Sequence, residues 1–262
     1  MASRVATRSP SGSRRRLGFA ILGVLLGIGV GVLLFMPVMP QKLDYHGFHD
    51  ARTLLGIPNA LNVVSNLAFA VVGWLGLRLV AGGATSATIL PSLRPAYATL
   101  FTGLLLTAFG SAYYHWSPSN ATLIWDRLPI AIAFMALFAT VMGERVNAGL
   151  GARALIPLVV IGVASVLYWA AFDDLRPYGI VQFYPVLAIP VLIACFPSTH
   201  GGGRLLLGAI ACYVVAKVLE EADGAIYGVS GWISGHTLKH LAAALGAWLI
   251  YRMVAMRRPL SD

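Results

Sequence analysis

Charged residues are scarce in this sequence. Only 11% of its 262 residues are Asp, Glu, Lys or Arg, whereas a soluble domain carries about 25%. Hydrophobic residues make up 58%, and the mean hydropathy is +0.77. A soluble core of this chain length could not absorb such an apolar surplus, so much of it must face lipid.

Other features are also missing. Alternating apolar and polar strands of membrane-spanning length are absent, which argues against a transmembrane barrel, and we find no internal repeat. Cys195 and Cys212 are the only cysteines; both lie inside apolar runs, so we expect free thiols rather than a disulfide or a metal site. The net charge of +9 does not indicate nucleic-acid binding, because the basic residues lie at the ends of apolar runs.

What the sequence does contain is a series of long apolar runs. A membrane-spanning helix needs about 20 mostly apolar residues. Three of the runs that qualify, the fourth, seventh and eighth, carry charges near one end. The sequence therefore predicts an all-α, polytopic membrane helical bundle. The expected spans are 17–39, 59–80, 95–116, 121–143, 153–172, 178–197, 203–222 and 235–256.

The first of these runs follows Arg14, Arg15 and Arg16 and could be a cleaved signal peptide. It is long for that role and no A-x-A site ends it, so we expect an uncleaved anchor helix. The organisation that follows is a seven-helix core with one extra N-terminal helix. Its expected segments are a basic tail at 1–16, the extra helix at 17–39, an outer loop at 40–58, the core at 59–256 and a tail at 257–262.

The positions of the charges predict the orientation of the spans. With a cytoplasmic N-terminus, most of the Lys and Arg residues fall on the inner side, as the positive-inside rule requires. All acidic residues except Glu144 and Asp262 then fall on the outer side. An even number of spans places both termini in the cytoplasm. The outer side could be periplasm, organelle lumen or cell exterior.

Ionisable residues at membrane depth are functional candidates by default, and this topology gathers several at the outer end. His115 ends the third span, Asp126 begins the fourth, and His236 and His240 begin the eighth. Residues four apart share a helix face, so His236 and His240 can bind one ion. A third imidazole from His115 would leave one tetrahedral position open, as in catalytic zinc sites.

Two further residues could assist such an ion. Ser111 lies one helical turn before His115 and could donate a hydrogen bond to a substrate carbonyl. Asp126 could accept a proton from an attacking water. Taken singly, each residue has a simpler interpretation: interfacial histidines, an Asp126–Arg127 ion pair, or a serine that packs between helices.

Other polar groups have weaker claims. In the outer loop, His46, His49 and Asp50 could cap the site or bind a second ion, but a solvated loop is the simpler interpretation. In the second span, Asn62, Ser65 and Asn66 are expected to form interhelical hydrogen bonds. Near the end of the seventh span, we expect an interfacial charge cluster formed by Lys217, Glu220, Glu221 and Asp223.

These residues together resemble the alkaline ceramidase family, within the superfamily that includes the progestin and adipoQ receptors. The resemblance covers about residues 59–256. It implies that three histidines hold one catalytic zinc ion and that an aspartate and a serine assist hydrolysis of the ceramide amide. The matching pieces are Asn62-Val63-Val64-Ser65-Asn66, Gly110-Ser111, Tyr114-His115, Asp126 and His236-x-x-x-His240.

By this resemblance His115, His236 and His240 are zinc ligands, with Asp126 as base and Ser111 as carbonyl partner. Asn59 stands where animal members carry a calcium-binding glutamate, which argues against a calcium site. The resemblance implies a membrane hydrolase for ceramide or another N-acyl lipid. A lipid receptor or sensor with a structural zinc, and a hydrolase of ester-linked lipids, remain alternatives. The sequence indicates no oligomeric state.

Overall fold

The computed structural model describes residues 12–82, 88–198 and 200–257, and within them every regular element is helical. The expected all-α bundle is therefore confirmed. Two short 3-10 turns, η1 (Leu43–His46) and η3 (Pro91–Leu93), accompany the α-helices. The α-helices are α1 (Gly12–Phe35), α2 (Ala60–Val64), α3 (Leu67–Ala81), α4 (Arg94–Trp116), α5 (Asn120–Arg145), α6 (Ala148–Phe172), α7 (Arg176–Cys195), α8 (Gly203–Glu221), α9 (Asp223–Ser230) and α10 (Gly235–Met256).

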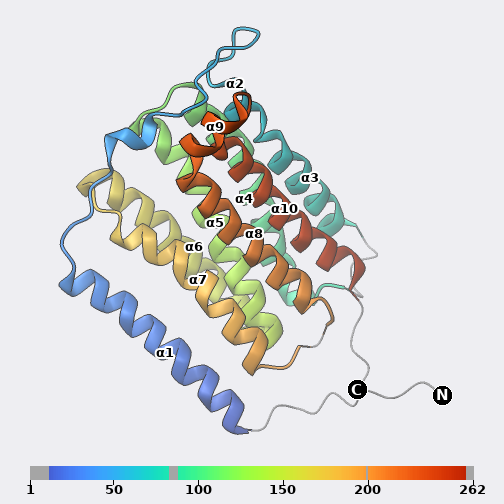
Figure 1. The fold of residues 1–262 in the computed structure, drawn as a ribbon. Coiled ribbons are helices and arrows are strands. Elements are labelled where there is room, and N and C mark those ends of the chain that lie inside the picture. Colours follow the sequence, from blue (N-terminus) through green and yellow to red (C-terminus); the bar gives the residue numbers. More distant parts are fainter. Residues whose placement is uncertain (1–11, 83–87, 199, 258–262) are drawn as a thin grey trace.

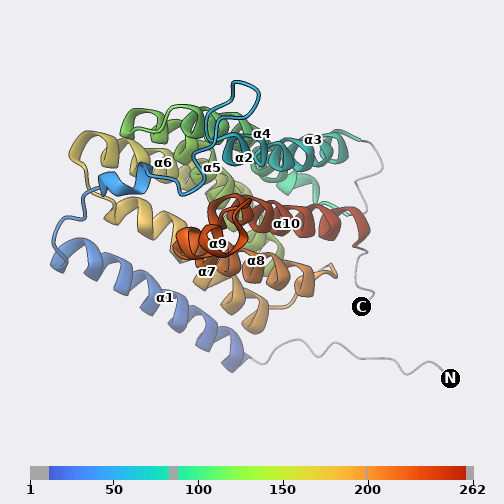
Figure 2. The ribbon, with the colours of Figure 1, turned by 45° about the horizontal axis from the view of Figure 1, so that its top comes forward.

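The long helices run side by side (Figures 1 and 2). From α3 to α7, each helix packs against the next, while α8 packs against α10 and α10 returns to α3. The contact between α7 and α8 is the loosest in this ring. Helix α1 lies outside the ring and packs mainly against α7.

Six segments are long and apolar enough to cross a membrane: α1, α2 with α3, η3 with α4, α5, α6 and α7. This indicates a membrane protein, and the six segments correspond to six of the eight expected spans. The other two, α8 and α10, are helices of 19 and 22 residues within the same bundle. Both helices carry charged or polar residues within their length, including Lys217, Glu220 and Glu221 on α8 and His236, Lys239 and His240 on α10. The side on which each terminus lies stays a prediction.

Local sequence signals fix the helix starts at one end of the bundle. Ser119 caps α5: its hydroxyl accepts a hydrogen bond from Thr122 N at 3.2 Å, and the Thr122 side chain accepts from the Ser119 backbone. Ser234 caps α10 in the same way by accepting from Thr237 N. These caps satisfy backbone N–H groups that would otherwise lack partners. The end of α4 and the starts of α5 and α10 therefore meet at one end (Figure 1).

Helix α1 is attached along one stripe. Gly18 lies against Cys195 and Phe196 of the α7 end, and Gly29 lies close to Ile180. At the other end of α1, Arg176 donates a hydrogen bond to Leu33 O at 3.2 Å and another to Met36 O. Both cysteines, Cys195 and Cys212, are free thiols, as expected.

Candidate metal centre and the cavity beside it

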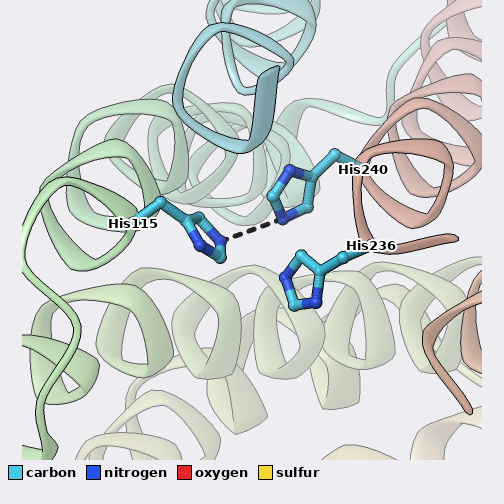
Figure 3. Close-up of side chains that lie close together, drawn as sticks. All are labelled: His115, His236 and His240. Carbon is cyan, nitrogen blue, oxygen red and sulfur yellow. Dashed lines mark hydrogen bonds between the residues drawn. The ribbon is translucent and has the colours of Figure 1, made fainter. Parts of the chain in front are cut away.

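The three predicted histidine ligands converge. His115 comes from the last turn of α4, and His236 and His240 come from the first two turns of α10 (Figure 3). One ring nitrogen from each lies within 4.8 Å of the other two. All three residues are buried, with exposed fractions of 1%, 4% and 4%.

The spacing suits a metal ion. The Nε2 atoms of His115 and His240 are 3.1 Å apart, and zinc–nitrogen bonds of 2.0–2.1 Å in a tetrahedron place ligand nitrogens about 3.3 Å apart. Nε2 of His236 is buried and has no hydrogen-bond partner in the described part of the chain. A buried nitrogen without a partner is unfavourable unless something binds it. The three-histidine group could therefore hold a metal ion.

Ser65 fixes the orientation of one ring. Its hydroxyl lies 2.7 Å from Nδ1 of His240 and donates to the carbonyl oxygen of Asn62 at 3.1 Å. A hydroxyl has one proton, so Ser65 must accept its second hydrogen bond from Nδ1–H of His240. Nε2 of His240 then carries the free lone pair that a metal requires. Metal-binding histidines commonly have such a partner on the other nitrogen.

Asp223 holds the start of α10. Its Oδ1 accepts from His236 N at 2.7 Å, and its Oδ2 lies 3.0 Å from Nδ1 of His49. Gly235 makes this approach possible, because a Cβ there would lie 2.2 Å from Leu219 O. Asp223 was expected in an interfacial charge cluster; the structure shows it supporting the histidine group instead.

The loop at 40–58 covers the histidine group. The Phe48 ring lies 4.7 Å, centroid to centroid, from both His115 and His236. Next to it, Nδ1 of His46 lies 2.9 Å from the Tyr114 hydroxyl. The side-chain amide of Asn59 donates to His115 O at 2.8 Å. The loop thus packs on the site, although the side chain of His49 remains 58% exposed.

Ser111 and Asp126 lie on facing turns of α4 and α5, both buried. Both residues line one cavity, and Asp126 Oδ1 has no hydrogen-bond partner in the described part of the chain. Gly110 brings the two helices together, since a Cβ at this position would lie 2.0 Å from Trp125 O. The expected pair of assisting residues is therefore placed together, with one carboxylate oxygen available.

The simple alternative of an Asp126–Arg127 ion pair does not hold in the described residues. Arg127 points elsewhere and donates to Gln41 Oε1 at 2.6 Å. Its guanidinium carbon lies 4.1 Å from the Trp169 ring centroid and 5.0 Å from that of Tyr178. Asp126 has no basic partner within salt-bridge distance there.

A cavity of about 660 Å³ adjoins these residues. Ligand pockets usually have volumes of about 300–1,000 Å³. Its walls are mostly apolar and come from α1, α4, α5, α7, α8 and α10. Ser111, Asp126 and His240 line it, so one of the three histidines and the two assisting residues face a space that could hold an apolar chain.

The cavity also has a charged lining that sequence reasoning did not place there. Glu220 accepts hydrogen bonds from Lys239 at 2.8 Å, from Tyr45 at 3.1 Å and from Lys217. All four residues line the cavity, as does Arg127. Because Lys217 and Glu220 are one turn apart on α8, the sequence showed that they are neighbours but not which way they point.

Two comparisons with known proteins were negative: no family model and no curated protein matches this chain. The assignment of a function therefore depends on the chemistry of the site. The site's main elements are a buried three-histidine group, a carboxyl and hydroxyl pair, and a largely apolar cavity.

Proposed function

We propose that this protein is a zinc-dependent hydrolase that cleaves the amide bond of an N-acyl lipid, ceramide or a related molecule, within the membrane. The observation that carries this proposal is the position of Asp126, Ser111 and His240 around one largely apolar cavity. A lipid amide needs both a polar reaction centre and an apolar space for its chain. A water-soluble substrate would gain little from binding in a cavity with such apolar walls.

The histidines would hold the metal ion. His115, His236 and His240 supply three nitrogens, which matches catalytic rather than structural zinc sites because one position is left for a ligand. Zinc at this site would supply Lewis acidity, polarising the amide carbonyl and acidifying a water molecule. A low-dielectric cavity strengthens both effects.

The remaining chemistry belongs to the protein side chains. Ser111 donates a hydrogen bond to the carbonyl oxygen as negative charge develops on it. Asp126 accepts a proton from the water that attacks the carbonyl carbon and returns it to the amine nitrogen when the C–N bond breaks. The free Oδ1 of Asp126 suits this role. The acyl chain enters between α7 and α8, where the bundle is loosest.

The test compares metal content and turnover in detergent-purified protein. Wild type should contain about one zinc per chain and release fatty acid from an N-acyl sphingoid base, measured by mass spectrometry. His236→Ala combined with His240→Ala should lose both. Asp126→Asn should keep its zinc but lose about 10²–10⁴-fold in turnover, the usual contribution of a general base.

Ester substrates of equal chain length serve as a comparison, because the same groups could hydrolyse them. Faster cleavage of the ester alone would replace the amide hydrolase with an ester hydrolase. Wild-type protein that contains zinc but cleaves neither class would reject the hydrolase and favour a lipid receptor or sensor.

A further inference from the structure

The cavity beside the histidine group contains more positive than negative charge. Lys217 and Lys239 come from different helices, α8 and α10, but both bind the same carboxylate, Glu220. Tyr45 donates to this carboxylate as well. One negative charge therefore balances two ammonium groups.

Arg127 adds a third cation to the same lining. It is 6% exposed, and its hydrogen-bond acceptor, the Gln41 amide, is neutral. No carboxylate lies within salt-bridge distance of it in the described ranges. Its Nη1 is buried and has no hydrogen-bond partner there. Aromatic rings cover the face of the guanidinium, but a ring cannot satisfy an N–H group at its edge.

Tyr213 provides a further unused donor. Its hydroxyl is buried without a hydrogen-bond partner in the described part of the chain, and the residue lines the same cavity. Arg127, Lys217 and Lys239 face only Glu220 and Asp126 as acidic lining residues. Buried charge without a counter-ion is strongly unfavourable, so this part of the cavity is suited to an anion.

We propose that, among N-acyl lipids, the cavity binds those with an anionic head group more tightly than neutral ones such as ceramide, with a carboxylate or phosphate bound by Arg127, Lys217 and Lys239. This inference rests on the proposed hydrolase, since it names the class of its substrate. The head-group anion would complete the hydrogen bonding of Arg127 Nη1 and the Tyr213 hydroxyl. A neutral head group would leave both the excess charge and these donors without partners. A small water-soluble anion would leave the apolar walls empty.

The test measures binding separately from turnover. Ser111→Ala serves as the background, because it slows the reaction without changing the charge of the cavity. Four ligands are compared in detergent micelles: N-oleoylglycine, the phosphate monoester of N-oleoylethanolamine, neutral N-oleoylethanolamine, and N-acetylglycine, which has no long chain. Affinity is taken from the rise of the unfolding midpoint with ligand concentration.

We expect both anionic lipids to bind at least about tenfold more tightly than N-oleoylethanolamine, as hydrogen bonds to charged groups usually provide. N-acetylglycine should bind weakly. Lys217→Glu should abolish the preference, while Arg204→Glu, an exposed charge reversal on the same helix, should keep it. Tyr213→Phe removes only a hydroxyl and should weaken anionic binding several-fold, which keeps the test valid if Lys217→Glu does not fold.

The results separate this inference from the hydrolase itself. If neutral N-oleoylethanolamine binds as tightly as the anionic lipids or more tightly, the proposed preference for an anionic head group is refuted, even if wild type hydrolyses amides. Preferential binding of the anionic lipids without any hydrolysis by wild type would keep the head-group site and reject the hydrolase. Binding of N-acetylglycine as tight as that of N-oleoylglycine would show an anion site for soluble ligands and reject the lipid assignment.

Discussion

Gly110 offers the sharpest test of how α4 and α5 position Ser111 and Asp126. Its missing side chain lets Trp125 O approach to within 2.0 Å of where a Cβ would lie, and real Cβ contacts are essentially never under 3.0 Å. In Gly110→Ala, α5 must therefore move by about 1 Å or more. Asp126, the next residue after Trp125, would move with it and away from Ser111.

The effect of such a displacement on reaction rate is known in enzymes: misplacing a reacting group by about 1 Å can lower the rate about 10²-fold. We expect turnover of the N-acyl lipid to fall by about this factor in Gly110→Ala. The zinc content should stay near that of wild type, because α4 and α10 carry the histidines and α5 carries none of them. Elemental analysis and fatty-acid release on the same preparation measure both quantities.

Gly103→Ala is the matched control. Gly103 lies two turns earlier on the same face of α4, and its Cβ would lie 3.0 Å from Ala133 and Pro129 O of α5. A shift of a few tenths of an ångström accommodates that, so its turnover should fall far less. Wild-type turnover in Gly110→Ala, or equal losses in both variants, would refute the idea that this close approach sets the Ser111–Asp126 geometry.

Three further predictions follow from the groups around the site. Ser65→Ala should weaken zinc binding about 10–100-fold, the usual effect of losing a partner of a metal-binding histidine, as measured by chelator competition. Phe48→Ala should speed removal of zinc by a water-soluble chelator, because the ring covers two of the three histidines. The hydrogen bonds from Arg176 lower the pKa of Asp174 to about 2. Because this lies below the unfolded value of about 3.9, the Asp174 carboxylate stabilises the fold above pH 4, and this contribution disappears as the pH falls toward 2. Asp174→Asn should therefore show a smaller loss of thermal stability across that pH window.

Each of these predictions has its own control. Ser65→Thr keeps the hydroxyl and should retain zinc; equal weakening in the Ala and Thr variants would mean that the hydroxyl is not what matters. Phe48→Leu keeps an apolar cover, and a chelation rate unaffected by Phe48→Ala would show that another barrier limits access. For Asp174→Asn, an acid profile identical to that of wild type would contradict the pKa argument.

The sequence predicted the helices and the convergence of the histidines for the same reason. Apolar runs of about 20 residues have few structural options in a bilayer, and their ends then fall at one of two depths. His115, His236 and His240 are at run ends that the charge pattern places on one side. Two such depths are enough to bring sequence-distant residues together, so the sequence alone predicts the three-histidine group.

The surroundings of the site could not be read in the same way. The sequence does not show that Asp223 reaches His236 N, or that Phe48 folds over two imidazoles, because short loops have no periodic pattern that fixes direction. Arg127 is another example: its neighbour Asp126 suggested an ion pair, but consecutive helical residues point to different faces. Its aromatic and amide partners come from helices and loops far away in sequence.

Helix α1 has a consequence for how specificity is encoded. Its residues Leu25, Ile28 and Val32 form part of the cavity wall, yet it packs mainly against one neighbour, α7. The polar groups that would bind and cleave a lipid lie in the loop at 40–58 and in later helices. Substitutions along one stripe of α1 would therefore change how long or bulky a chain fits without altering the chemistry. In the proposed hydrolase, chain-length selection and bond cleavage would therefore depend on separate parts of the sequence, which could diverge independently.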